Sequence, residues 1–167
     1  MNPFLLVYDA LWDMVASRAD LDALVKLGNR IRFDKDAPAT PMKTAIAAGD
    51  MPELVLAGAG MSCNLHVASN ACQVRKRYQW LCSTGEMRIE KLQSVQWMLA
   101  CATIDWQTIL TRLQWPEDSG RGFVKRTSLL DASEGFSDPQ RNRGIVGWSF
   151  VWGCEVEMWF ATADMRA

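Results

Sequence analysis

The sequence has little of what enzymes use for acid–base and metal chemistry. Its 167 residues include one histidine and five cysteines, and no two cysteines are spaced C-x-x-C. A zinc site needs about four nitrogen or sulfur ligands in clustered spacing. We therefore expect no metal site and no cofactor. The odd number of cysteines and their apolar neighbours predict reduced, buried thiols.

An excess of charge of one sign is missing as well. The chain has 18 Lys and Arg against 19 Asp and Glu, spread evenly, and its longest like-charge run is Arg75-Lys76-Arg77. Nothing in this balance favours specific binding to nucleic acid. No stretch approaches the ~18 apolar residues of a membrane span, and the first residues lack a signal peptide's basic region and apolar core. We expect no membrane partner, and a chain made and kept in the cytoplasm.

What is present is an ordinary globular composition with an unusual number of tryptophans. Hydrophobic residues make up 49% of the chain, and there are eight Trp against two Tyr. This length and composition predict a single α+β domain over residues 1–167. We expect a helical part in residues 1–50, with a helix over residues 3–17 and two shorter ones, and a sheet plus a long helix in residues 51–167.

Alternating apolar and polar residues predict a mostly antiparallel sheet of four to five strands. We expect a short strand over residues 54–57, an edge strand or hairpin arm over 58–70, and strands over 74–83 and 123–130, followed by a polar loop over 131–144. The last strand alternates over about fifteen residues from Ile145. A strand of that length outruns the sheet of one small domain, so we expect one end to project and be covered by a neighbour.

The clearest helical pattern follows a possible capping box at Ser83 and Glu86. An apolar stripe about seven turns long then runs from Leu92 to Leu113 and packs on one face of the sheet. A second apolar row lies beside it, formed by Trp97, Cys101 and Ile104. A helix that is apolar on two sides is usually covered on two sides. The second cover is either the N-terminal helix or another subunit.

Two carboxylates, Glu155 and Glu157, are close together on one face of the last strand. Without a nucleophile or histidine base beside them, they do not predict catalysis, and we expect no enzyme. Their i, i+2 spacing matches that of Arg75 and Arg77, which favours two cross-strand ion pairs or an equivalent contact between subunits. His66 is interpreted as a surface or edge residue.

Large aromatic residues outside the core are typical of protein interfaces. Two tryptophans fall on faces left over once one core is built. The candidate subunit or partner interface therefore consists of Arg75, Arg77, Trp97, Glu155, Glu157 and Trp159.

The order of elements resembles that of tail terminator (tail-completion) and related neck proteins of long-tailed bacteriophages. Three stretches support the resemblance: residues 50–54 before the first strand, residues 77–86 at the strand-to-helix turn, and the final strand, residues 142–160. The resemblance spans most of the chain, and no single motif in it is diagnostic. It brings no active-site residues with it.

The resemblance implies a structural virion protein at the head–tail junction, assembled in the cytoplasm of a bacterial host. Its partners would be further copies in a hexameric ring, tail tube and sheath proteins, and neck or connector proteins. DNA would pass through the lumen without specific binding, which suits a near-neutral chain. A neck or head-closure (stopper-like) protein and a non-viral α+β binding module remain alternatives.

Overall fold

The computed structural model describes residues 2–25, 30–32, 53–83, 90–114, 122–137 and 147–163. It confirms the α+β class, with a four-stranded antiparallel sheet and several helices. The elements in chain order are α1 (Pro3–Ala16), α2 (Ala19–Asp22), β1 (Arg30–Arg32), β2 (Glu53–His66), η2 (Val67–Ser69), β3 (Ala71–Ser83), α4 (Glu90–Leu110), β4 (Val124–Ser137) and β5 (Gly147–Ala161).

The strands follow the order β1-β2-β3-β5-β4 across the sheet. The three-residue β1 runs parallel to β2, and every other neighbouring pair is antiparallel. The four antiparallel strands have 13 to 15 residues each. Strands of five or six residues are commonest in globular proteins, so this sheet is unusually long for one small domain.

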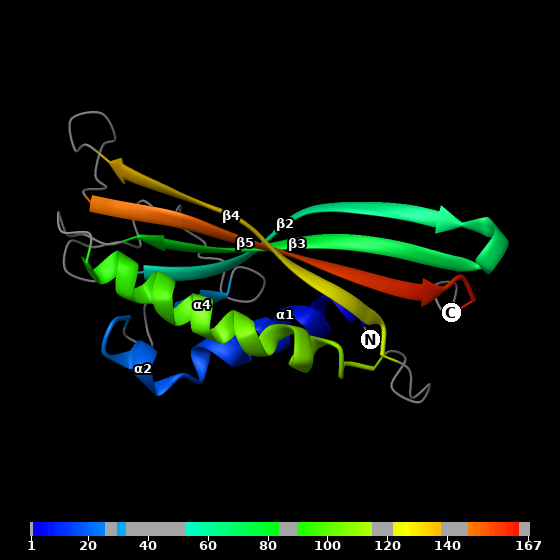
Figure 1. The fold of residues 1–167 in the computed structure, drawn as a ribbon, viewed down its shortest axis with the longest axis horizontal. Helices are drawn as coiled ribbons and strands as arrows, with labels where there is room; N and C mark the ends of the chain where they lie inside the picture. Colours follow the sequence, from blue (N-terminus) through cyan, green and yellow to red (C-terminus); the bar gives the residue numbers. More distant parts are fainter. Residues whose placement is uncertain are drawn as a thin grey trace.

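The expectation that the last strand outruns its sheet is wrong. β5 pairs with β3 from Ser149 to Ala161, and with β4 from Gly147 to Met158. Its neighbours β3 and β4 have 13 and 14 residues against its 15. The part that extends beyond the helices, toward the right in Figure 1, is the β2–β3 hairpin together with the end of β5 that pairs with it.

A β-bulge explains why the sequence predicted β2 as two pieces, a short strand over 54–57 and an edge strand or hairpin arm over 58–70. Gly58 lies opposite Tyr78, but the next pair is Met61 with Lys76, so β2 carries one extra residue there. A bulge shifts the alternation of side chains and makes the period-two pattern look weak. Lys76 is half-buried and donates from Nζ to the Ala59 carbonyl at 3.1 Å.

The expected polar loop over residues 131–144 is also wrong in its first half. β4 continues to Ser137 and pairs with β5 up to Gly147. A register shift between Leu129 and Ala132 breaks the alternation here too. Among the described strands β4 pairs only with β5, and an edge strand tolerates the polar residues that suggested a loop.

The helices α1 and α4 lie side by side on one face of the sheet, called the inner face below (Figure 1). Aromatic pairs join α1 to the strands: Tyr8 meets Tyr78 edge-on at 5.8 Å between ring centroids, and Trp12 stacks on Trp80 at 6.3 Å. α1 begins where the sequence predicts, because Asn2 caps the Phe4 amide and Pro3 occupies the first turn.

The described helix α4 has 21 residues, about six turns at 3.6 residues per turn, where about seven were expected. It ends at Leu110 and not at Leu113. Its buried stripe contains Leu92, Val95, Met98, Leu99, Ala102, Trp106 and Leu110. Ile109, expected in that stripe, is exposed. Gln107 fixes the helix to β4, since its Oε1 accepts from the amide and the hydroxyl of Thr127, both at 2.6 Å.

Several predictions from the sequence lie outside the described residues. They are the short helix expected between Thr40 and Gly49, the end of the capping box at Glu86, and the second half of the polar loop. The side chain of Ile104 lies outside them as well.

Candidate functional site

Two cross-strand ion pairs lie on the outer face of the sheet, opposite to the helices. Arg75 is in register with Glu157 and Arg77 with Glu155, as the spacing of these residues predicted. In each pair the arginine Nε donates to a carboxylate oxygen at 3.2 Å. Because both arginines are about half exposed, each pair contributes at most about 1 kcal/mol to stability.

Glu157 is held ionised by its neighbours. The Trp159 indole Nε1 donates to Glu157 Oε1 at 2.8 Å, while Arg75 binds Oε2. The pKa of Glu157 lies below its ordinary value of 4.5, and the indole hydrogen bond is the largest cause. Gln73 and Arg75 lower this pKa further. Arg126 of β4 lies in register on the other side. A carboxylate held in this way is poorly suited to general acid–base catalysis, which needs a pKa near the working pH.

Trp159 is half-buried and has partners within the chain, where the sequence suggested an exposed aromatic. Its ring stacks on His66 with centroids 4.9 Å apart and an angle of 27° between the planes. Its amide donates to the Phe123 carbonyl at 2.8 Å. His66 itself is exposed at the end of β2, which confirms its prediction as a surface or edge residue.

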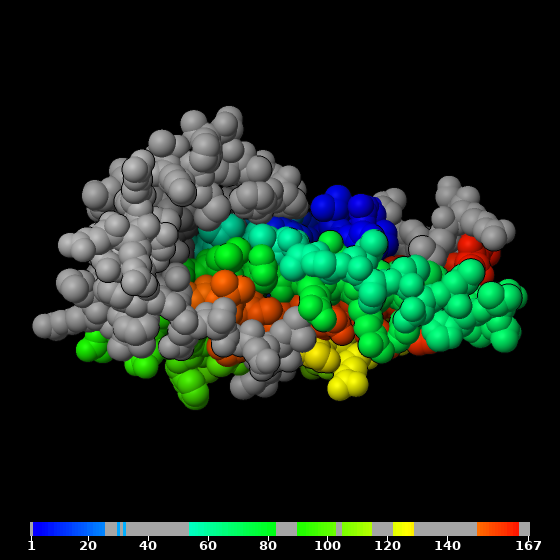
Figure 2. Space-filling view, turned by 90° about the horizontal axis from the view of Figure 1, so that it is seen from above, coloured from blue at the N-terminus to red at the C-terminus, as the bar shows by residue number. Residues whose placement is uncertain are grey.

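Five of the six candidate interface residues thus form one cluster on the outer face. We call Arg75, Arg77, Glu155, Glu157 and Trp159 the outer patch. Figure 2 looks onto this face, where β2, β3 and β5 form the surface toward the right-hand end. Its charges are paired internally, so it presents a nearly neutral surface to a partner.

Trp97 does not belong to the outer patch. It lies on α4, in the helical layer on the inner face, and 73% of its surface is exposed. α1 packs against α4 through the core, yet Trp97 stays open to solvent. The N-terminal helix therefore does not provide the second cover expected over this side of α4.

Sequence reasoning missed a second apolar surface, at the end of the β2–β3 hairpin. We call residues 61–75, which comprise the end of β2, η2 and the start of β3, the arm. Three apolar side chains of the arm are exposed: Met61 by 56%, Leu65 by 60% and Val67 by 75%. Met61 and Leu65 share the inner face with buried core residues such as Val74, as the strand register shows. The alternation of Met61, Cys63 and Leu65 was the available signal, once the bulge before it is recognised.

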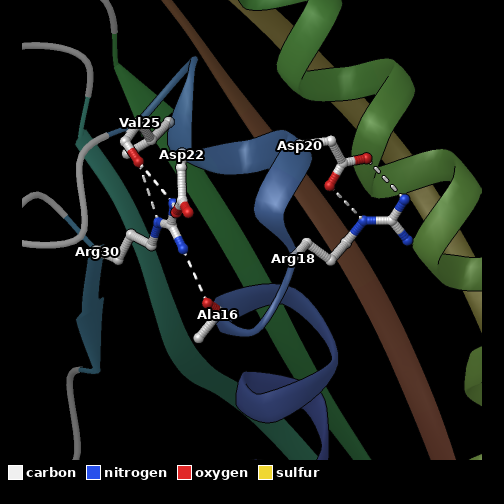
Figure 3. Close-up of polar contacts among 6 residues, drawn as sticks. All are labelled: Ala16, Arg18, Asp20, Asp22, Val25 and Arg30. Carbon is white, nitrogen blue, oxygen red and sulfur yellow. Dashed lines mark hydrogen bonds and ion pairs between the residues drawn. The ribbon is translucent and has the colours of Figure 1, made fainter.

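Two buried arginines were also missed, because charged residues are rarely fully buried. Arg30 fastens the end of α1 to the turn after α2 (Figure 3). Its Nη1 donates to the Ala16 carbonyl at 2.8 Å, its Nε and Nη2 donate to Val25, and Nη2 also binds Asp22. Figure 3 also shows the more exposed pair of Arg18 with Asp20, at 2.8 Å.

Arg32 is the second of these, and it completes the link between β1 and α1. Its Nη1 donates to Asp9 at 2.6 Å, and its guanidinium lies 5.1 Å from the ring centroid of Tyr8. β1 therefore points its two arginines inward. Both arginines serve the fold, because they join β1 to the N-terminal helices.

Within the described residues, the outer face carries a shallow hollow. It has a volume of about 230 Å³ and is lined by Gly60, Met61, Ser62, Arg75, Arg77 and Glu155. Pockets that bind drug-sized ligands measure roughly 300–1,000 Å³ and are mostly apolar. This hollow is small and ringed by paired charges, which makes it a poor site for such a ligand.

Within the described ranges, no group of three His, Cys, Asp or Glu side chains could hold a metal ion. No helix in those ranges is long and apolar enough to cross a membrane. A scan against protein-family models finds no match to this chain, and a search of the curated proteins finds none either.

Proposed function

We propose that this chain is a structural virion protein, a tail terminator that caps the tail tube of a long-tailed bacteriophage as a ring of identical copies. The ring would be a hexamer at the head–tail junction, in contact with tube and sheath proteins on one side and neck proteins on the other. The proposal rests on the resemblance in element order and on the surfaces that the fold leaves uncovered.

The observation that supports it most is the presence of two unlike apolar surfaces on separate elements. One is the arm, with Met61, Leu65 and Val67, and the other is Trp97 on α4. When a contact joins two different patches of the same chain, each copy offers one patch to each neighbour. Such head-to-tail contacts form closed rings when the rotation between copies closes.

The fold and the charge are consistent with this role. The α4 helix packs on one face of the sheet, with short N-terminal helices beside it. The sheet extends beyond these helices, and the extended part supplies an arm that reaches a neighbouring copy. The outer patch pairs its charges internally, and the whole chain has a formal net charge of −1. A lumen lined by such a chain would let DNA pass without tight binding, because affinity for phosphates depends on unpaired cations.

Size-exclusion chromatography with light scattering tests the proposal on the full chain. We expect a mass near six copies, and six-fold rings in negative-stain images. Leu65→Asp should reduce the mass to that of a monomer, since it places a charge in the apolar contact of the arm. Arg18→Ala, which changes an exposed ion pair, is the matched control and should leave the ring intact.

A monomer that stays monomeric when tail tube is added would contradict the ring. A ring that binds neck proteins but not tail tube would identify the chain as the alternative, a head-closure or other neck protein. A monomer that binds an unrelated peptide or ligand would favour the α+β binding module.

A further inference from the structure

Two cysteines of the arm lie against each other on the inner face of the sheet. The Sγ atoms of Cys63 on β2 and Cys72 on β3 are 2.9 Å apart. In the strand register Cys63 is opposite Val74, and Leu65 is opposite Cys72, so the two cysteines are diagonal neighbours across the hairpin. A disulfide bond is about 2.05 Å long, so the two sulfur atoms need to approach by less than about 1 Å to form one.

We propose that Cys63 and Cys72 form a reversible disulfide that cross-links the arm under oxidising conditions. The bond would join β2 to β3 around η2 and the turn at Asn70, which has a left-handed backbone with φ of 49°. It would hold together the part of the sheet that has no helices beneath it. The bond forms within one chain, and its test is made at a concentration at which the chain is a monomer, because Cys63 lies between Met61 and Leu65 on the face proposed for contact with another copy.

The two sulfur atoms differ in access, which sets the order of the reaction. Cys63 is exposed, while Cys72 is buried with 3% of its surface accessible. A soluble oxidant therefore reaches Cys63 first. The hydrogen bond with Cys63, together with burial, raises the pKa of Cys72 to about 11, so Cys72 keeps its proton until the second step.

Oxidised glutathione, a small-molecule disulfide, is a suitable oxidant. The Cys63 thiolate attacks one of its sulfur atoms, forms a mixed disulfide and releases the first glutathione thiolate, which takes up a proton. Cys72 then attacks the Cys63 sulfur, which forms the protein disulfide and breaks the mixed one. The second glutathione leaves with the proton from Cys72. Two cysteine thiols are oxidised and one disulfide is reduced.

The other cysteines provide the contrast that makes the site selective. Cys82 and Cys154 are buried and Cys101 is half-buried. Burial raises the pKa of Cys154 to about 12, which suppresses its thiolate and its reactivity. In the described structure the close Sγ contact is between Cys63 and Cys72.

The test is a thiol count on the full chain after incubation with oxidised glutathione. The protein is then denatured in acid and its free thiols are alkylated and counted by mass spectrometry. We expect alkylation to fall from five thiols to three, because two of the five cysteines are joined, and a reductant should restore all five. Peptide mapping should identify the joined pair as Cys63 with Cys72.

Variants separate this reaction from simple exposure of Cys63. Cys72→Ser should leave Cys63 with a stable mixed disulfide to glutathione, and Cys63→Ser should leave Cys72 as a free thiol. Cys101→Ser is the matched control, and two thiols should still be lost. Amide hydrogen exchange in residues 64–71 should slow after oxidation of the wild type and stay unchanged in Cys63→Ser.

Two results would overturn the proposal. In the first, wild-type Cys63 stops at the mixed disulfide with glutathione and Cys72 stays free. In the second, a non-reducing gel shows that Cys63 forms a disulfide with another chain and not with Cys72 of its own chain. Both results are readable even if the variants fold poorly, because both are measured on the wild-type chain.

Discussion

The two halves of one sheet are built on the same apolar pattern and differ in what covers them. In the covered half, α1 and α4 lie on the inner face, and Leu56 and Trp80 are fully buried there. In the arm the inner face continues with Met61 and Leu65, which are exposed. The inner face of β2 therefore carries apolar residues along its whole length, while the helices of this chain cover only the half with Leu56. The uncovered part is the region that a neighbouring molecule could complete.

The largest effect should come from the core of the covered half, and two tryptophans of α4 provide a matched comparison. Trp106 is 1% exposed and Trp97 is 73% exposed. Trp106→Ala should lower the free energy of unfolding by about 3–5 kcal/mol, through lost burial and a cavity. Trp97→Ala should change it by less than about 0.5 kcal/mol. Urea unfolding, at a concentration at which both variants are monomers, measures the two values.

Equal losses in the two variants would break the comparison, because they would mean that Trp97 is covered within its own chain. A loss for Trp97→Ala that appears only at concentrations where the chain assembles would sharpen it. That result would place Trp97 in a contact between copies.

The next largest effect should come from the buried guanidinium of Arg30. Arg30→Met keeps the apolar stem and removes every hydrogen bond of the head group to Ala16, Val25 and Asp22. The carbonyls of Ala16 and Val25 lose a charged donor, so we expect a loss of about 2–4 kcal/mol in urea unfolding. Arg18→Met, which breaks the exposed pair with Asp20, should cost at most about 1 kcal/mol. Similar values for the two variants would contradict a structural role for Arg30.

A smaller effect should appear in the pH dependence of the outer patch. The pKa of Glu157 is lower in the folded chain than its ordinary value of 4.5, so its ionised form stabilises the fold. That contribution is fully present above pH 4.5 and is lost as the pH falls through the lower pKa of the folded state. The difference in unfolding free energy between wild type and Glu157→Gln should be up to about 1 kcal/mol at neutral pH and should vanish in acid.

Trp159→Phe provides the control for the cause of this shift. The variant keeps an aromatic ring beside His66 but lacks the indole N–H that donates to Glu157. The pKa of Glu157 in an NMR titration should therefore rise toward its ordinary value. An unchanged titration would assign the shift to Arg75 and Gln73 alone.

The strongly periodic parts of this fold could be predicted from the sequence, and the parts with bulges could not. The faces of β3 and β5 follow an unbroken alternation, so the ion pairs of Arg75 with Glu157 and of Arg77 with Glu155 were predictable. Bulges after Gly58 and Leu129 reset the alternation: the first divided β2 into two predicted pieces, and the second hid the later half of β4. The inward-facing arginines were missed for a different reason: the sequence does not display the main-chain carbonyls that bind Arg30, and Asp9, which binds Arg32, is 23 residues away.

The folded chain separates Trp97 from the other candidate interface residues, and the periodicity of the sequence could not predict this separation. Alternation places a residue on a face of its own strand or helix, but not on a face of the molecule. Trp97 and Trp159 both fall outside the stripes of the core, yet Trp159 packs on His66 and Trp97 is open to solvent. Trp159 is covered because the pairing of β2 with β3 and of β3 with β5 brings His66, at the end of β2, next to it. Such a contact depends on the pairing of the whole sheet.

The smallest effect on stability should come from the arm, and two leucines of β2 make the comparison direct. Leu56 is fully buried, while Leu65, on the same face of the same strand, is 60% exposed. Leu56→Ala should cost about 2–5 kcal/mol in urea unfolding of the monomer, and Leu65→Ala less than about 0.5 kcal/mol. If Leu65→Ala proved as costly as Leu56→Ala, the arm would already be covered within one chain, and its inner face would have nothing to offer a neighbour. A Leu65→Ala chain that unfolds like the wild type but assembles less well would show that this leucine is kept for contact with another molecule, because its burial then contributes only when a second molecule supplies the cover.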